Sequence, residues 1–159
     1  MTQPPASTGR CSACAEIAGE VTAPGGVIRD DGLWYVSHHT GPYTDPGELI
    51  VKTRRHCESL AELTREEASA LGPLLRTAVS SLERVVVAER IYAVSFNERI
   101  RHVHFLLLPR TAAMPRGHVI SDIYRRVRAL LRRAGVVRNP TTEERSAAAA
   151  RIRQVWERA

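Results

Sequence analysis

The clearest hydrophobic pattern in the chain predicts a long amphipathic helix that begins after Thr64. Apolar residues recur there at spacings of three and four, which places them on one helical face. They are Leu71, Leu74, Leu75, Ala78, Val79, Leu82, Val85 and Val86. Thr64 and Glu67 fit a capping box at the start of the helix. Pro73 interrupts the pattern, so a kink or a later helix start is the alternative.

Shorter patterns on both sides of this helix predict β-strands. Strand-like segments occupy residues 27–29, 33–37, 48–53, 90–96 and 102–108, the last ended by Pro109. The first two flank the turn Asp30-Asp31-Gly32 and predict a hairpin, and the last two predict an antiparallel pair. A polar loop, residues 38–47, connects two strands, and we expect it to form a pocket wall.

Helical patterns also occur at both ends of the chain. Residues 11–20 predict a short helix or turn, ended by Pro24-Gly25-Gly26. A further helix is predicted from Ser121, with a cap at Gly135, and a last one from a cap at Thr142 to near Trp156. An apolar face on the first of these comprises Ile123, Tyr124, Val127, Leu130 and Leu131. Hairpin, strand, long helix, strand pair and trailing helices together predict an α+β fold.

The length of 159 residues is that of one domain, which we place at residues 11–159. Residues 1–10 are polar and rich in Pro, Ser and Thr, which favours a disordered lead-in without the apolar core of a secretory signal. No apolar run approaches the roughly 18 residues that a membrane span needs. A cytoplasmic location follows by default.

The basic charge is concentrated in one part of the chain. Residues 1–120 hold equal numbers of basic and acidic side chains, so the whole net charge of +6 comes from residues 121–159. A solvated helix face is one interpretation of this basic C-terminal helical extension. An anionic partner such as nucleic acid is the other.

Two cysteines and two histidines are candidate metal ligands. Cys11 and Cys14 form a C-x-x-C pair, and His56 and His102 each lie beside a predicted strand. Two thiolates and two imidazoles complete a tetrahedral zinc shell, which would tie the N-terminal segment to the sheet. A redox role for the cysteine pair and a surface position for His56 are the alternatives. The chain has three cysteines, and this odd count argues against a disulfide framework.

His102 and His104 alternate on one predicted strand, so both side chains point to the same sheet face. Such convergence suggests a site, although two half-buried structural histidines would give the same pattern. His38, His39 and Tyr43 lie in the expected pocket-wall loop, where a role in binding a base or ribose is one interpretation and solvent exposure the other.

The segment His102-Val103-His104-Phe105-Leu106-Leu107-Leu108-Pro109-Arg110 resembles the histidine-triad motif. Other stretches resemble that family in the right order: Cys11-Ser-Ala-Cys14 with Ile17-Ala18-Gly19-Glu20, Asp45-Pro46-Gly47-Glu48, Arg54-Arg55-His56 with Glu58-Ser59-Leu60, and Phe96-Asn97-Glu98. The similarity covers roughly residues 11–110.

The resemblance implies a histidine-triad-like antiparallel sheet with a long helix, here with extra C-terminal helices, and a homodimer. It implies binding of a nucleotide or nucleoside phosphate and reaction at the α-phosphate. By position His104 is the nucleophile that forms a nucleotidyl-histidine intermediate, and Asn97 matches a phosphate-contacting position. His102 matches a structural Zn²⁺ ligand, beside Cys11, Cys14 and His56.

Further residues are singled out by their chemistry or because they differ from the family motif. Arg99 and Arg101 are nearby cations for a phosphate, although strand alternation turns Arg101 away. His39 is our candidate for substrate binding in the loop. Leu106 stands where the motif has its third histidine, and a leucine forms no hydrogen bond with phosphate.

Three functions are therefore compatible with the sequence. The first is a nucleotide hydrolase or nucleotidyltransferase of the phosphoramidase or dinucleoside polyphosphate hydrolase type. The second is a nucleotide-binding protein that has lost efficient turnover through Leu106. The third is an interaction module that contacts nucleic acid through the basic C-terminal helices.

Overall fold

The computed structural model describes residues 11–116 and 118–158, so the lead-in predicted at residues 1–10 falls outside the described part. Five antiparallel strands form one sheet in the order β1-β2-β3-β5-β4. The strands are β1 (Val27–Asp30), β2 (Trp34–His38), β3 (Leu49–Thr53), β4 (Arg90–Val94) and β5 (His104–Arg110). The helices are α1 (Ser12–Ile17), α2 (Arg65–Val85), α3 (His118–Arg133) and α4 (Thr142–Trp156), with a 3-10 turn at Leu60–Glu62. The predicted α+β class is confirmed.

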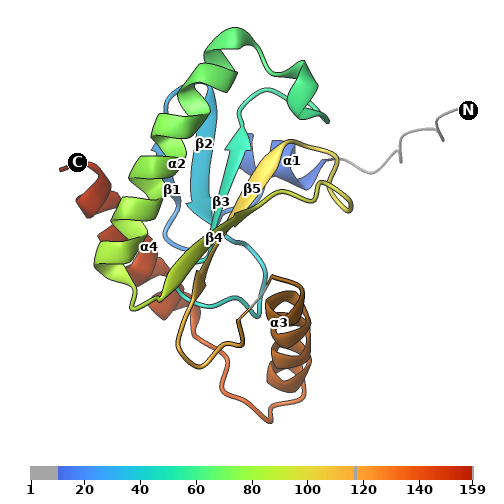
Figure 1. The fold of residues 1–159 in the computed structure, drawn as a ribbon, viewed down its shortest axis with the longest axis vertical. Coiled ribbons are helices and arrows are strands. Elements are labelled where there is room, and N and C mark those ends of the chain that lie inside the picture. Colours follow the sequence, from blue (N-terminus) through green and yellow to red (C-terminus); the bar gives the residue numbers. More distant parts are fainter. Residues whose placement is uncertain (1–10, 117, 159) are drawn as a thin grey trace, which may run out of the picture.

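One face of the sheet carries the hydrophobic core. Alternate strand residues, among them Val36, Val51 and Leu107, point to the same face and are fully buried. They pack against α2 and α4, which lie together on that side (Figure 1). The opposite face carries the polar strand residues, including Lys52, which contacts α1 through Glu16. The chemistry of the molecule therefore lies on the face away from α2 and α4.

Helix α2 runs without a break from Arg65 to Val85, so the alternative of a later start at Pro73 is wrong. The predicted capping box is present, because Thr64 accepts from the Glu67 amide and Glu67 accepts from the Thr64 amide. Pro73 is exposed, so water can solvate the carbonyl group that loses its helical partner there.

The strand predicted at residues 102–108 begins and ends later than expected. It starts at His104 and continues through Pro109 to Arg110, so His102 precedes the strand and Pro109 does not end it. β3 pairs with β5 only as far as Leu107, and beyond that point β5 has only β4 beside it. A strand tolerates a proline where one side has no neighbour to receive an N–H group.

The C-terminal helices also differ slightly from their predicted bounds. α3 begins at His118 rather than Ser121, and Thr141 rather than Thr142 caps α4 by accepting from the Glu144 amide. Gly135 has a φ of 73° and its amide donates to Arg132, as expected of a residue that ends α3. None of the helices in the described ranges combines the length and the apolar character needed to cross a membrane.

Arginines rather than apolar contacts hold α3 to the rest of the chain. Ile123, Val127 and Leu130 on its apolar face are each more than half exposed. Arg132 is buried and donates to Asp45 and to the Tyr43 carbonyl at 2.7 Å. In Figure 1 this helix stands apart from α2 and α4. Its position is therefore set by polar contacts with the loop between β2 and β3.

Candidate functional site

The four predicted metal ligands converge, although they come from three distant parts of the sequence. The donor atoms of Cys11, Cys14, His56 and His102 all lie within 4.8 Å of one another. Cys11 Sγ lies 3.5 Å from His102 Nδ1, and Cys14 Sγ lies 3.4 Å from His56 Nδ1. Zinc bonds of about 2.3 Å to sulfur and about 2.0 Å to nitrogen, at tetrahedral angles, put such pairs about 3.6 Å apart. The side chains therefore fit a tetrahedral zinc ion.

A buried partner fixes which nitrogen of His102 faces the sulfur atoms. His102 Nε2 donates to the Thr53 carbonyl at 2.7 Å, so Nδ1 carries the lone pair. This is the arrangement by which a second polar group orients a histidine that binds a metal. Burial lowers the pKa of His102, which keeps the ring neutral and able to coordinate. Burial and the adjacent Cys11 thiol raise the pKa of Cys14 to about 11, so the Cys14 thiol ionises at neutral pH only when a cation balances it.

His104 opens the next strand and has a different environment. Its Nδ1 donates to the His102 carbonyl at 2.6 Å, which leaves the lone pair on Nε2. The backbone amide of His104 donates to Asn97 Oδ1 at 3.3 Å. Both the ring and the backbone of His104 are therefore held in one orientation by the segment that precedes β5.

A cavity of about 640 Å³ contains His104. The three leading candidates for substrate binding line it as well: His39, Asn97 and Arg99. The other lining residues are Ser12, Phe96, Glu98, Ile100, Arg125 and Arg126. The structure thus brings together side chains from the start of α1, the β2–β3 loop, the β4–β5 loop, β5 and α3.

Asn97 has a φ of 51°, which only a few residues other than glycine adopt. Asparagine tolerates this left-handed conformation better than most side chains. Its side chain spans from the turn after β4 to the His104 amide, so the unusual backbone places the turn directly against the candidate nucleophile. Backbone strain of this kind clusters at functional sites because the surrounding structure must maintain it.

His39 enters the cavity as a neutral hydrogen-bond donor. The Gly41 amide donates to His39 Nδ1 at 2.8 Å, so its proton is on Nε2. Burial, followed by the charge of Arg125, lowers the pKa of His39 to about 4. The ring therefore carries no charge at neutral pH and can donate from Nε2 to an anionic or hydroxyl group in the cavity.

Three other residues singled out in the sequence lie elsewhere. His38 is fully buried at the end of β2, where the Gly47 amide donates to its Nε2 at 3.2 Å, so it is a structural residue. Arg101 lies 3.8 Å from Glu58, consistent with its expected orientation away from His104. Tyr43 lines a different cavity, described below.

A buried ion pair beneath α1 was not predicted. Lys52 Nζ lies 2.5 Å from Glu16 Oε2, and both side chains are almost completely buried. Lys52 is the residue of β3 directly opposite His104 in the strand register. Burial lowers the pKa of Lys52, and Glu16 acts in the opposite direction. An isolated lysine in a short strand gives no sign of its partner, which comes from a helix 36 residues earlier in the chain.

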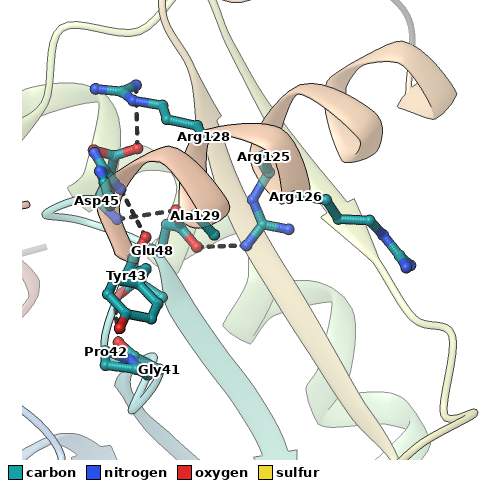
Figure 2. A pocket seen from close by; sticks show the side chains of 11 residues that line it. Gly41, Pro42, Tyr43, Asp45, Glu48, Arg125, Arg126, Arg128 and Ala129 are labelled. Atoms are coloured by element: carbon teal, nitrogen blue, oxygen red, sulfur yellow. Dashed lines mark hydrogen bonds and ion pairs between the residues drawn. The ribbon is translucent and has the colours of Figure 1, made fainter. Parts of the chain in front are cut away.

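Arg125 and Arg126 of α3 were also missed, because the basic C-terminal segment was interpreted only as a whole. Both line the His104 cavity and also a second cavity of about 220 Å³ between α3 and the β2–β3 loop. Arg125 donates to Glu48 at 2.7 Å in the wall of that second cavity (Figure 2). Glu48 is almost fully buried, and its other oxygen accepts from the Asp45 amide. A glutamate at the start of a predicted strand was the available signal for a long-range cationic partner.

Comparison with known proteins gives matches at the level of structure. No protein-family model matches the sequence, and comparison with curated proteins by sequence gives no match. A Hit-like protein involved in cell-cycle regulation from Bartonella henselae matches with a TM-score of 0.66 and 14% identity, over 92% of this chain and 96% of the other. A zinc-bound histidine triad family protein from Mycobacterium smegmatis matches with a TM-score of 0.64 and 14% identity, over 93% and 94% of the two chains.

This chain has the histidine-triad fold. A hypothetical histidine triad nucleotide-binding protein from Sulfolobus tokodaii also matches, with a TM-score of 0.56 and 14% identity over 82% of this chain and 100% of the other. The fold predicted from the motif is therefore confirmed. Within the histidine-triad fold, the third position of the motif is Leu106, a half-buried residue paired with Ile50 and Val94.

Proposed function

We propose that this chain is a zinc-stabilised enzyme that hydrolyses or transfers nucleotides at the α-phosphate through a covalent intermediate on His104. The observation that carries the proposal is the hydrogen bond of 2.6 Å from His104 Nδ1 to the His102 carbonyl. It leaves a lone pair on Nε2 of a ring that lines a large cavity with cationic side chains. A neutral imidazole is a competent nucleophile near pH 7.

The reaction has two displacements at phosphorus. The His104 Nε2 lone pair forms a P–N bond with the α-phosphorus, while the bond from phosphorus to the leaving group breaks and the leaving group departs with its electron pair. Water or another acceptor then forms a P–O bond, the P–N bond breaks, and the proton of the acceptor goes to solvent. Asn97, Arg99 and the His39 Nε2–H donor are our candidates to hold the phosphate oxygens.

The proposed zinc ion has a structural role. It would be held by Cys11, Cys14, His56 and His102, whose donor atoms have tetrahedral spacing, and it would supply a cross-link rather than a reactant. His102 precedes His104 by two residues and its carbonyl accepts from the His104 ring, so a zinc-bound His102 would fix the acceptor that orients the nucleophile. A homodimer and a cytoplasmic location remain predictions of the same proposal.

A nucleotide-binding protein without efficient turnover is the second candidate, and Leu106 is the observation that favours it. A leucine at the third motif position offers no proton to a leaving group. For the third candidate, contact with nucleic acid, several arginines of α3 and α4 already have partners within the chain. Arg132 and Arg145 bind groups of the β2–β3 loop, and Arg153 donates to carbonyls near β1.

Mass spectrometry of the intact protein tests the enzyme proposal. Zinc-loaded protein is mixed with an adenosine phosphoramidate and quenched in acid within seconds, and the mass of the intact protein is then measured. Product formation is followed in parallel. We expect an added nucleotidyl mass that is absent from His104→Ala. Zinc content and thermal stability of the variant serve as controls for folding. Neither adduct nor product with several nucleotides, in protein that binds them, would leave the binding-protein candidate in its place.

A further inference from the structure

An open cavity of about 680 Å³ lies beside the end of β5 that is opposite to His104. Its lining residues come from β4 and the residue before it, from β5, and from the segment after β5: Glu89, Arg90, Tyr92, Arg110 and Arg116. Arg110 is six residues from His104 along β5, which corresponds to about 20 Å in an extended strand. Among the described residues the two cavities share no lining side chain, so this cavity is a separate site.

The strand register places three of these side chains together. Arg90 lies directly opposite Arg110 in the pairing of β4 with β5, and Tyr92 is two residues further along β4. Residues that are directly opposite, or two apart on one strand, point to the same sheet face. Leu107 points into the core, so Arg110, three residues further on, points to the face away from α2 and α4. Like charges directly opposite each other destabilise a sheet, so this arginine pair needs negative charge beside it.

Glu89 supplies one negative charge to the three arginines. Its carboxylate accepts from the guanidinium of Arg110, which is almost fully buried and also donates to the Met114 carbonyl at 3.4 Å. The hydrogen bond from Arg110, followed by the charges of Arg116 and Arg90, lowers the pKa of Glu89. Three guanidinium groups thus face one carboxylate among the described lining residues, an excess of two positive charges. The Arg110 Nε–H group has no acceptor in the described part of the chain, so an anion would satisfy a buried donor.

We propose that Arg90, Arg110 and Arg116 form an anion site that binds a doubly charged phosphate group, either inorganic phosphate or the phosphate of a small monoester. Guanidinium groups bind phosphate oxygens through parallel charge-assisted hydrogen bonds, and a dianion matches the excess charge of the cavity. Arg90 and Arg116 are exposed and can reach an incoming ion, whereas Arg110 is held in place by Glu89. Tyr92 offers an aromatic ring to the organic part of a monoester. The site does not involve the candidate nucleophile, so it stands independently of the proposed function.

Nuclear magnetic resonance of side-chain signals tests the site in the purified full chain. Inorganic phosphate, phenyl phosphate and acetate are titrated separately at constant ionic strength and pH 8, where a phosphate carries about two negative charges. The signals followed are the Nε–H group of Arg110 in this site and the ring of His104 in the other cavity. The variants are Arg90→Gln, Arg116→Gln, Glu89→Gln and the matched control Arg151→Gln, an exposed arginine of α4 outside both cavities.

We expect inorganic phosphate to shift the Arg110 signal with a dissociation constant of about 1 mM, the strength of a few charge-assisted contacts, whereas acetate leaves it unchanged. Arg90→Gln and Arg116→Gln each weaken binding about tenfold, and Arg151→Gln has no effect. Glu89→Gln strengthens binding about tenfold, because it removes the carboxylate that competes for the same guanidinium groups. Since Arg90 and Arg116 are exposed, their variants keep the test decisive even when Glu89→Gln does not fold.

Phenyl phosphate distinguishes the two sources of the anion. Binding at least as tight as that of inorganic phosphate identifies a monoester as the occupant, whereas a response to inorganic phosphate alone identifies the free ion. An Arg110 signal that neither phosphate shifts, or equal losses of affinity in the glutamine variants at positions 90 and 151, would overturn the site. Shifts confined to the His104 ring would place the phosphate in the other cavity and overturn the site as well.

Discussion

Acidification tests the environment of His39, because its pKa of about 4 lies well below the ordinary value of 6.5. The main cause is burial, and the positive charge of Arg125 acts in the same direction. A histidine whose pKa falls on folding binds a proton more readily in the unfolded chain. Protonation below pH 6.5 therefore stabilises the unfolded state, and the free energy of unfolding decreases as pH falls from about 6.5 to about 4.

The size of the effect follows from the two pKa values. Each pH unit between them corresponds to about 1.4 kcal/mol, so His39 accounts for a loss of about 3 kcal/mol between pH 7 and pH 4. Denaturant unfolding at a series of pH values gives the free energy of unfolding of the native chain and of His39→Gln. The glutamine side chain does not titrate, so the variant lacks only the contribution of position 39. We expect the stability difference between the two proteins to change by about 3 kcal/mol over that interval.

The comparison with His39→Gln removes the other acid effects. Both proteins carry the same Cys and His cluster, so any loss of metal in acid contributes equally and cancels in the difference. Nuclear magnetic resonance of the His39 ring gives the pKa directly. A measured pKa of 6 or above, together with a stability difference that is constant with pH, would refute the argument that His39 is neutral in a buried, cationic environment.

Three further predictions concern the buried ion pair, the metal cluster and a glycine packed against α4. Glu16→Gln leaves Lys52 buried without its partner and should destabilise the protein by about 3–5 kcal/mol, whereas adding Lys52→Met should restore most of this loss. A double variant no more stable than Glu16→Gln in urea would contradict that reasoning. Cys14→Ser should lower the zinc content from about one per chain to near zero, with a lower thermal midpoint, and elemental analysis decides. Gly25→Ala should cost about 1–3 kcal/mol, because φ is +74° and the added Cβ would lie 2.7 Å from Ala149 Cβ; unchanged calorimetric stability would contradict it.

Local features of the molecule could be predicted from the sequence because each depends on neighbouring residues. The capping box of Thr64 and Glu67 and the apolar stripe of α2 follow from spacing alone. The boundaries of β5 could not be predicted in this way. They depend on the pairing of β5 with β3, which stops at the Leu49–Leu107 pair and so leaves room for Pro109 within the strand.

The candidate site likewise contains residues whose roles could be predicted from the sequence and residues whose roles could not. Cysteine and histidine have few chemical roles in proteins. The convergence of Cys11, Cys14, His56 and His102 could therefore be predicted without coordinates. Arginine and lysine have many uses, and their roles depend on partners far away in the chain. Arg125 meets Glu48 across 77 residues, a pairing that spacing does not indicate.

The Cys and His cluster does not line the His104 cavity, but helix α1 connects the two. A helix of six residues is too short to be stable by itself, so its position must come from contacts with the sheet. The cluster fixes its first turn through Cys11 and Cys14, and the Glu16 pair with Lys52 fixes its last. Ser12, which lies between the two cysteines, forms part of the cavity wall near His104. Metal binding would therefore order one wall of the cavity and, through His102, the orientation of the proposed nucleophile.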